Sequence, residues 1–316
     1  MTISAFLKLV ELPTKVASVI PFLFGTFYAF YAFGEFNFTN TVIMFLSMLI
    51  FDMTTTAINN YIDYTKALQK DGYGYEIHNA MGAYGLSPKL VRFLIYVMLM
   101  VSTGLGFYLV FRTNIIVLGL GILCFAIGIL YTFGPLPISR TPFGEIFSGF
   151  TMGLILPFIA IYIQVFNQGI VNFSFDEWQL LLVLNIKALI GIFLVCLPFI
   201  NCIANIMLAN NLCDMAEDLI NKRYTLPIYV GKKAGLILWE ALYYLSYVAI
   251  IISAVLGYLP WLCLLTLITL IPIRKNIAAF KVLQTKKDTF IFAIKNFLTL
   301  NSYYILTLGF AILLKI

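Results

Sequence analysis

Charged residues are scarce in this sequence. Only 11% of its 316 residues are charged, whereas 62% are hydrophobic, and its mean hydropathy is +0.97. A soluble globular domain has about 25% charged residues. The composition therefore argues against a soluble enzyme and indicates an integral membrane protein.

Histidine and paired cysteines are lacking as well. The only histidine is His78, which argues against a catalytic triad or a zinc site built on histidine. The five cysteines form no C-x-x-C pair, and four of them lie in apolar runs. We therefore expect unpaired, structural thiols rather than a metal–thiolate site. No small-x-small cleavage site follows a short apolar core near the N-terminus, so the first apolar run is expected to remain as a helix.

Long apolar runs dominate what is present, and each is long enough, or nearly so, to cross about 30 Å of hydrocarbon. Only helices fit such runs, because a lipid-exposed backbone must satisfy its own hydrogen bonds. We predict an all-α membrane bundle of about nine transmembrane helices, forming a single domain over residues 1–316. The predicted spans are 16–33, 41–58, 90–111, 113–131, 146–166, 186–208, 236–256, 258–273 and 290–314.

The net charge of +6 does not indicate nucleic-acid binding, because the basic residues lie in the loops between apolar runs. The long or charged loops 59–89, 132–145, 209–235 and 274–289 all fall on one side of the predicted bundle. The positive-inside rule makes that side cytoplasmic. We therefore predict a multi-pass protein of the cell membrane with a cytoplasmic N-terminus, and we expect 167–185 to be a base-poor loop on the opposite side.

The stretch NNLCDMAEDLINKRYTLP, at the end of the sixth predicted span, gathers much of the scarce charge. Asn210, Asp214 and Asp218 follow one another at intervals of four residues. On a continuous helix this interval drifts by only about 40°, so the three side chains would face one way. Lys222 and Arg223 follow directly.

The stretch NNYIDYTK, at the end of the second predicted span, repeats the pattern. Asn59 and Asp63 have the same Asn-x-x-x-Asp spacing, and Lys66 follows. The next position of the series is Ala67, and the next acid is Asp71. The two stretches indicate a parallel internal repeat with a site shared between the halves.

The two polar stretches suit a divalent cation. Facing carboxylate clusters repel one another, and carboxylates are costly near a membrane. Mg²⁺ relieves both problems, because it takes one or two carboxylates and leaves positions for water and phosphate. Nearby bases would bind the remaining phosphate oxygens. The alternative is that these residues only cap helices and solvate loops, but two matched motifs favour the metal site.

Three further features carry weaker signals. The stretch YTFGPLPISRTPFGE, from Tyr131 to Glu145, predicts a rigid loop, although an ordinary helix connector has the same composition. The glycines of 78–88 suggest a mobile cover. Asp52 and Glu240 lie inside apolar runs, where they are either part of a polar pathway or structural acids satisfied by partners.

With these motifs, the sequence resembles the UbiA superfamily of intramembrane aromatic prenyltransferases, and within it the 1,4-dihydroxy-2-naphthoate polyprenyltransferases of menaquinone synthesis. The resemblance rests on NNYIDYTK, YTFGPLPISRTPFGE and NNLCDMAEDLINKRYTLP, and the nine-span layout extends it over nearly the whole chain. The first motif departs from the family pattern, since Asn60 stands where Asp is usual and Ala67 replaces a further acid.

The resemblance implies a reaction and a set of site residues. A polyprenyl diphosphate would bind through Mg²⁺ between the two motifs, and 1,4-dihydroxy-2-naphthoate would accept the prenyl group with loss of CO₂ and diphosphate, giving demethylmenaquinone. Asp63, Asp214 and Asp218 would be the catalytic acids. The implied metal ligands are Asn59, Asp63, Asp71, Asn210, Asp214 and Asp218. The implied substrate contacts are Lys66, Lys222, Arg223, Tyr131 and Arg140. The other expected partner is the lipid bilayer, with no nucleic acid.

Three alternatives to this interpretation remain. In the first, the protein prenylates another acceptor, such as 4-hydroxybenzoate, haem or a glycerol-phosphate lipid. The protein is a secondary transporter, whose site would lie near mid-membrane. The protein is a scaffold whose acids are vestigial, in which case replacing Asp214 would change only stability.

Overall fold

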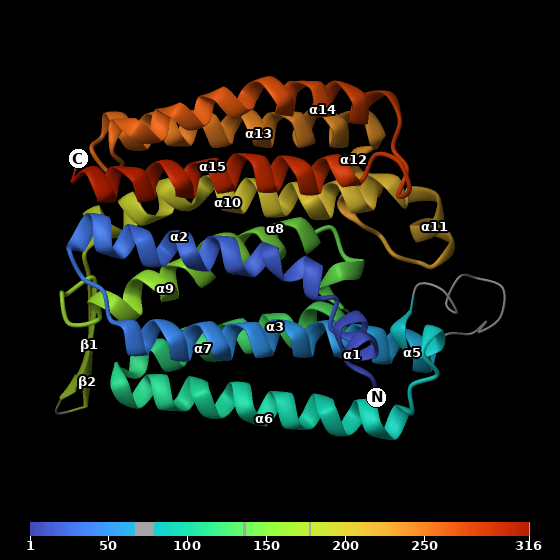
Figure 1. Ribbon diagram of the computed structural model, residues 1–316, viewed down its shortest axis with the longest axis horizontal. Helices are drawn as coiled ribbons and strands as arrows, with labels where there is room; N and C mark the ends of the chain where they lie inside the picture. The colour runs from blue at the N-terminus through green and yellow to red at the C-terminus, as the bar shows by residue number, and fades with distance from the viewer. Residues whose placement is uncertain (67–78, 135–136, 177, 316) are drawn as a thin grey trace. The chain divides into compact units, whose positions relative to one another are not determined.

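The computed structural model describes residues 1–66, 79–134, 137–176 and 178–315 (Figure 1). Within them, nine helices are long and apolar enough to cross a membrane, so the predicted number of spans is confirmed. These helical segments are Leu12–Phe33, Phe38–Thr65, Pro88–Arg112, Ile115–Thr132, Gly144–Val165, Ile186–Cys213, Lys232–Val255, Trp261–Val282 and Ile291–Leu314.

The chain forms two compact units. Unit 1 contains Met1–Val19 and Phe38–Asn114, and unit 2 contains Ile20–Asn37 and Ile115–Ile316. Helix α2 (Val16–Phe33) begins in unit 1 and continues into unit 2.

Unit 1 is built around two long helices, α3 and α6, which pack side by side. The Ser47 hydroxyl donates to the carbonyl of Ser102 at 2.8 Å and so links these helices. The elements of unit 1 are α1 (Ile3–Leu9), the 3₁₀ turn η1 (Leu12–Lys15), the start of α2, α3 (Phe38–Lys66), α5 (Ala80–Ala83) and α6 (Pro88–Arg112).

The short helix α5 belongs to the core of unit 1. Ala80 and Met81 are buried against Leu9 and Ala57, and the Asn79 side chain caps the helix by accepting from the Met81 amide. From Asn79 onward, the segment is therefore a packed element and not the mobile cover that its glycines suggested. His78 lies outside the described residues.

Unit 2 is built around α10, which is buried along most of its length and contacts α8, α13 and α15 (Figure 1). The described elements of unit 2 before α10 are the rest of α2, α7 (Ile115–Thr132), η2 (Ile138–Arg140), α8 (Gly144–Phe150), the π-helical turn η3 (Thr151–Ile155), α9 (Leu156–Val165), β1 (Val171–Asp176) and β2 (Gln179–Leu184). The elements from α10 onward are α10 (Ile186–Cys213), α11 (Met215–Ile220), α12 (Leu226–Val230), α13 (Lys232–Val255), η4 (Trp261–Thr269), α14 (Leu270–Val282) and α15 (Ile291–Leu314).

Specific polar and steric contacts fix the neighbours of α10. The Asn205 side-chain amide donates to the Trp239 carbonyl at 2.9 Å, and the Trp239 indole donates back to the Asn205 carbonyl at 3.0 Å, which locks α10 to α13. Gly153 lies so close to α10 that a Cβ there would be 2.4 Å from the Ile200 nitrogen. Glycine therefore permits the close approach of η3 to α10.

The segment 167–185 differs from the expected loop, because it forms an antiparallel hairpin in which Val171 pairs with Leu184 and Asp176 with Gln179. The second strand, QLLLVL, is apolar after Gln179 and exposed along its whole length. A short, uniformly apolar run lacks the alternation that identifies a strand in sequence. The all-α prediction is confirmed for the bundle, with this hairpin as an addition.

Candidate functional site

The second polar motif lies at the C-terminal end of α10. The helix ends at Cys213, and Asp214 leaves helical geometry with φ −101° and ψ 8°, after which α11 begins at Met215. The prediction of one continuous helix through Asp218 is therefore wrong. The Asp214 amide still donates to the Asn210 carbonyl at 3.2 Å, and the Asp218 amide donates to the Asp214 carbonyl at 2.8 Å. These bonds hold the three motif residues in successive turns.

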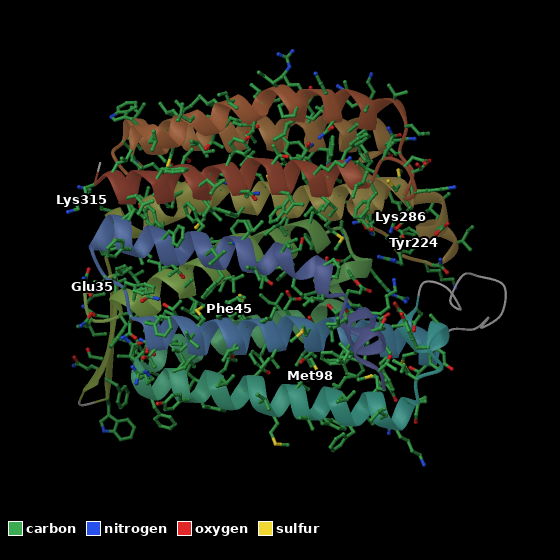
Figure 2. The ribbon with its side chains drawn as sticks, in the orientation of Figure 1. Glu35, Phe45, Met98, Tyr224, Lys286 and Lys315 are labelled. Atoms are coloured by element: carbon green, nitrogen blue, oxygen red, sulfur yellow. The ribbon has the colours of Figure 1, made fainter. Side chains whose placement is uncertain are left out.

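A lysine from a distant loop joins the first two motif residues. Lys286, between α14 and α15, donates from Nζ to Oδ1 of Asn210 at 2.6 Å and lies 2.7 Å from Oδ2 of Asp214. Lys286 and Tyr224 lie at the same end of unit 2, whereas Lys315 lies at the opposite end (Figure 2). The predicted site did not include Lys286, because the sequence showed only that this residue lies in a charged loop.

Asp218 is the buried acid of the motif, with 2% of its surface exposed. Arg223 Nε lies 3.3 Å from Oδ1 of Asp218, and the Thr225 hydroxyl donates to Oδ2 at 3.2 Å. Lys222 has a positive φ of 54°, and this turn lets the Arg223 amide return to the Asp218 carbonyl at 2.8 Å. The motif and the basic pair that follows it thus form one folded unit.

The pKa of the Asp218 carboxyl reflects this setting. Burial is the largest cause and raises the pKa above its ordinary value, because it penalises the charged form. Arg223 and the Thr225 hydrogen bond act in the opposite direction, and the charge of Asp214 raises the pKa again. The negative charge of Asp214 thus disfavours the ionised form of Asp218, and a bound cation would favour it.

The predicted loop 131–145 packs against the same turn. The Tyr224 amide donates to the Arg140 carbonyl at 3.1 Å, and Arg223 Nη2 lies 3.4 Å from the Ser139 carbonyl. The Arg140 side chain is exposed. The structure thus brings Arg140 and the second motif together through the backbone.

Glu145 and Asn211 form a buried polar pair beneath the motif. The Asn211 side-chain amide donates to Oε1 of Glu145 at 2.9 Å, and the two residues are 1% and 4% exposed, respectively. The other oxygens of this pair, Oε2 of Glu145 and Oδ1 of Asn211, are buried without a hydrogen-bond partner within the described parts of the chain. The buried hydroxyl of Tyr131 borders this layer, since a Cβ on Gly144 would lie 3.6 Å from it. Sequence reasoning recognised Glu145 only as a loop charge.

The first polar motif lies at the C-terminal end of α3, in unit 1. Asn59 is half-buried and Asp63 is exposed, and the helix ends at Lys66. Ala67 and Asp71 lie outside the described residues, so the structure gives no geometry for the fourth acid that the sequence suggested.

Asn60, which the resemblance places where the family usually has Asp, has a packing role. Its side-chain amide donates to the Leu9 carbonyl at 3.1 Å and to Oε1 of Glu11 at 3.3 Å. The backbone carbonyl of Asn60 accepts a hydrogen bond from the Asn79 side-chain amide at 2.9 Å. An amide is needed here because the partners of its nitrogen are all acceptors.

The two acids inside apolar runs are satisfied by partners. Asp52 lies 2.8 Å from Lys15 Nζ and accepts from the Ser18 hydroxyl at 2.6 Å, and Lys15 is buried. Glu240 pairs with Lys281 at 2.6 Å. The sequence left open whether these acids belong to a polar pathway or are structural acids satisfied by partners. These contacts agree with the structural role.

The second motif has the donor chemistry that Mg²⁺ requires. No three His, Cys, Asp or Glu side chains in the described ranges form a ready metal cluster. Asp214, Asp218 and Asn210 nevertheless offer two carboxylates and an amide oxygen, which is the partial ligand set that Mg²⁺ completes with water or phosphate. Lys286 already places positive charge between two of these donors. The residues present therefore fit the ion.

These features define a multi-pass membrane protein with a folded cluster of acids and bases at the end of α10, the most buried of the candidate spans in the described residues. The chain belongs to the UbiA prenyltransferase family, whose model matches residues 18–302. It is therefore a membrane prenyltransferase, and the family match includes segments of both units.

Individual relatives agree with this assignment. The chain is 30% identical over 250 residues to 1,4-dihydroxy-2-naphthoate octaprenyltransferase of Bacillus subtilis (strain 168), covering 79% of this chain and 73% of that protein. Its fold is similar to an apo UbiA homolog from Aeropyrum pernix K1, with a TM-score of 0.67 and 15% identity over 96% of this chain and 98% of that one. It is also similar to a UbiA homolog from Archaeoglobus fulgidus bound to DMAPP and Mg²⁺, with a TM-score of 0.57 and 13% identity over 96% and 99% of the two chains.

Proposed function

We propose that this protein transfers a polyprenyl group from polyprenyl diphosphate to 1,4-dihydroxy-2-naphthoate, with loss of CO₂ and diphosphate, and so forms demethylmenaquinol, the reduced form of demethylmenaquinone. The observation that carries the proposal is the 30% identity to a protein named for this acceptor. The cluster at the end of α10 supports the diphosphate half of the reaction, because it joins oxygen donors for Mg²⁺ to bases that suit phosphate.

The second motif is proposed to bind the diphosphate through Mg²⁺. Asn210, Asp214 and Asp218 would hold the ion, which is also present with prenyl diphosphates in the solved homologs from Archaeoglobus fulgidus. When bound, Mg²⁺ would neutralise charge on the diphosphate as the C–O bond breaks. Asn210, Asp214 and Asp218 would then be held in position to bind the diphosphate through the ion.

The bases have different proposed roles. Lys286 donates to Asn210 and neutralises Asp214 in the structure, so an incoming ion would release its ammonium group to contact diphosphate oxygens. Arg223 is tied to Asp218 and to the Ser139 carbonyl, and it would mainly hold the turn in place. Lys222 is exposed beside it and is a second candidate for diphosphate contact.

The first motif is proposed to act on the same substrate. Asn59 and Asp63 would supply oxygen ligands at the end of α3, and the sequence adds Asp71 as a candidate ligand and Lys66 as a candidate diphosphate contact. Asn60 is left out of this set, because its side chain is used to hold the N-terminal segment. This assignment explains why the chain can depart from the family pattern at that position.

The acceptor is proposed to approach near Tyr131 and Arg140. Ionisation of the allylic C–O bond gives a cation that the electron-rich naphthoate ring attacks, and the new C–C bond is followed by loss of the carboxylate as CO₂. Exclusion of water by the apolar bundle would protect the cation from hydrolysis. The bordering layer of Glu145 and Asn211 has unused oxygens, which suit hydrogen bonding to acceptor hydroxyls after local adjustment.

The deciding experiment uses membranes that contain the full-length protein. They are incubated with labelled polyprenyl diphosphate and 1,4-dihydroxy-2-naphthoate, with Mg²⁺ or with EDTA, and the product is identified by mass spectrometry. Demethylmenaquinol that forms only with Mg²⁺ is expected. Product from 4-hydroxybenzoate but not from naphthoate would overturn the acceptor and keep prenyl transfer. Equal product with EDTA would overturn the metal assignment.

The protein is further proposed to lie in the cell membrane with the Asp214 end of α10 facing the cytoplasm, because the basic loops gather at that predicted side. Two variants, Lys222→Cys and Trp178→Cys, would be made in a chain whose own cysteines are replaced. Intact cells that contain each variant would be treated with a membrane-impermeant thiol reagent. Labelling at Trp178 alone is expected. Labelling at Lys222 alone would reverse the orientation.

A further inference from the structure

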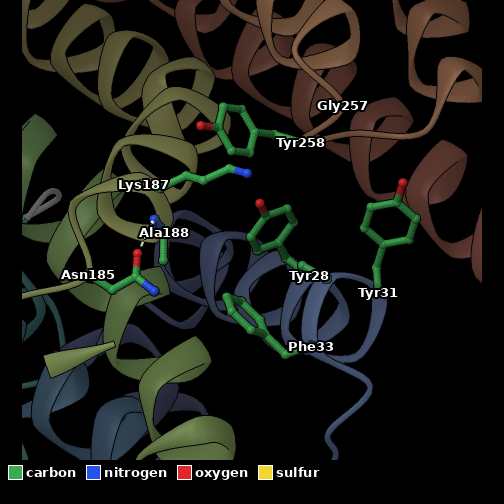
Figure 3. A pocket seen from close by; sticks show the side chains of 9 residues that line it. Tyr28, Tyr31, Phe33, Asn185, Lys187, Ala188, Gly257 and Tyr258 are labelled. Atoms are coloured by element: carbon green, nitrogen blue, oxygen red, sulfur yellow. Dashed lines mark hydrogen bonds between the residues drawn. The ribbon is translucent and has the colours of Figure 1, made fainter. Parts of the chain in front are cut away.

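A separate cavity lies at the other end of unit 2, with a volume of about 380 Å³ (Figure 3). Three parts of the unit surround it: the end of α2, the start of α10 and the turn that follows α13. The lining residues used below are Tyr28, Tyr31, Phe33, Asn185, Lys187 and Tyr258.

The polar groups of the cavity are suited to an anion. Lys187 extends its ammonium group into the space between the hydroxyls of Tyr28 and Tyr258 (Figure 3). Tyr28 is a buried residue, 3% exposed, whose hydroxyl reaches the cavity, whereas Lys187 is exposed (Figure 3). Lys187 makes no ion pair within the described parts of the chain, and no lining residue is acidic. The cavity thus offers one base and tyrosine hydroxyls without an acid, which favours a negatively charged ligand that accepts hydrogen bonds.

The start of α10 adds positive potential to the same space. The helix is 28 residues long and begins at Ile186, and Asn185 caps it by accepting from the Ala188 amide at 3.1 Å. The remaining amides of the first turn and the helix dipole favour negative charge at this end. A negatively charged ligand is thus favoured by the helix dipole, by the Lys187 ammonium and by the tyrosine hydroxyls.

The geometry of the cavity is fixed by close packing. Tyr258 lies against Gly191 of α10, where a Cβ would approach the tyrosine ring to 2.6 Å. Gly257 has a positive φ of 77°, which sets the turn that presents Tyr258. The hydroxyl of Tyr258 is therefore held at the cavity by features of two elements and is not a loosely placed surface group.

The cavity is remote from the candidate diphosphate site. Asn210 and Asp214 lie at the opposite end of α10, and a 28-residue helix is about 42 Å long. The cavity lies where the spans Leu12–Phe33 and Lys232–Val255 end and the span Ile186–Cys213 begins, which is the depth of lipid headgroups. Its ligand is therefore expected from the membrane interface and not from the prenyl-transfer reaction.

We propose that this cavity binds the phosphate headgroup of an anionic bilayer phospholipid. Lys187 and the hydroxyls of Tyr28 and Tyr258 would donate to the phosphate oxygens. The rings of Tyr31 and Phe33 would contact the glycerol and the start of the acyl chains, as amphipathic aromatic residues do at membrane interfaces. Basic pockets between transmembrane helices recognise anionic headgroups by this chemistry. The apolar part of the lining favours a lipid over free phosphate.

The test is native mass spectrometry of the full-length protein in detergent, titrated with phosphatidylglycerol or with phosphatidylcholine of the same acyl chains. Preferential retention of phosphatidylglycerol is expected. Lys187→Met should weaken that retention about tenfold, as expected for loss of one charge-assisted hydrogen bond, and Lys187→Arg should restore most of it. Tyr28→Phe, which removes only the hydroxyl, should weaken it about threefold.

The matched control is Lys315→Met, which removes an exposed base at the same end of unit 2 that does not line the cavity (Figure 2). Its lipid retention should equal that of the unchanged protein, and unfolding temperatures should show that all variants are folded. Equal loss in Lys315→Met and Lys187→Met would overturn a specific site in favour of general surface charge. Binding of inorganic phosphate as tight as that of phosphatidylglycerol would overturn the lipid assignment. Because the readout is lipid retention, it is independent of prenyl transfer.

Discussion

The C-terminal ends of α3 and α10 have the same Asn-x-x-x-Asp spacing, but their surroundings differ. The helices are 29 and 28 residues long. At the end of α10, Asp218 is buried and contacts Arg223 and Thr225, while Lys286 joins Asn210 and Asp214. At the end of α3, Asp63 is exposed.

The difference shows that matched spacing predicts where polar residues lie but not how they are held. The end of α10 is followed by α11 and a tight turn, which return Arg223 and Thr225 to the motif. At the end of α3, the neighbouring Asn60 is committed to the N-terminal segment of its own unit. We therefore expect the α10 motif to contribute more to substrate binding and catalysis than the described part of the α3 motif.

The largest expected effect is that of Asp214→Asn, which keeps the size of the side chain but removes its charge. It should lower kcat/KM for prenyl transfer at least 100-fold, as expected for loss of a preorganised group that stabilises developing charge. The measurement is steady-state kinetics in Mg²⁺-containing membranes. Glu217→Gln removes an exposed acid of α11 and should stay within about twofold of the unchanged enzyme. A similar loss in both variants would show that net charge matters and not the motif.

A smaller effect is expected at the first motif. Asp63→Asn should lower kcat/KM about tenfold, because Asp63 is exposed and water screens its charge more than that of the partly buried Asp214. The Mg²⁺ concentration that gives half-maximal activity should rise in parallel. Asp71→Asn serves as the comparison, since it tests the other acid of this stretch directly. If Asp63→Asn were as damaging as Asp214→Asn, the proposed inequality of the two motifs would be wrong.

Adjacent lysines provide the next test. Lys286→Met should raise the KM for polyprenyl diphosphate about fivefold with a smaller change in kcat, because its proposed contact is with substrate oxygens. Lys286→Arg should recover part of the loss. Lys287→Met removes the neighbouring exposed base and should leave both constants nearly unchanged. Equal effects at positions 286 and 287 would contradict a specific role for Lys286.

The smallest effect on catalysis is expected where the chain departs from its family. Asn60→Asp restores the usual acid but removes the amide that donates to Leu9 and Glu11, so its carboxylate would face acceptors. We expect unit 1 to lose about 1 kcal/mol of stability. The measurement is thermal unfolding in detergent, with Asn59→Asp as a half-buried control. Increased activity without destabilisation would show that position 60 belongs to the site.

Much of the fold was predictable because lipid imposes a strong and local requirement. Apolar runs must form helices to satisfy their backbone, and nine such segments are found in the described residues. Polar residues extend some helices beyond the apolar runs: the second predicted span ends at 58, but α3 continues to Lys66. Hydropathy marks where lipid contact ends, whereas the helix continues as far as its backbone hydrogen bonds do.

The candidate site was predictable in part. The sequence named Asn210, Asp214 and Asp218, and the structure gathers them with Arg223. Lys286 and the buried Glu145–Asn211 pair were missed as site residues, because their relation to the motif depends on contacts between segments distant in the chain. Whether the whole chain acts as one domain remains a prediction, and so does a shared role for the two motifs.

By itself, the sequence determined that the protein is a membrane helix bundle with two matched polar motifs, because hydropathy and spacing act over neighbouring residues. Only the tertiary structure decided that Asp214 ends a helix, that Lys286 pairs with Asp214 and that Asn60 holds the N-terminal segment at Leu9. It also decided that Tyr28, Lys187 and Tyr258 line one cavity. These outcomes depend on which distant segments meet, and the burial and charge of a side chain follow from its neighbours in space.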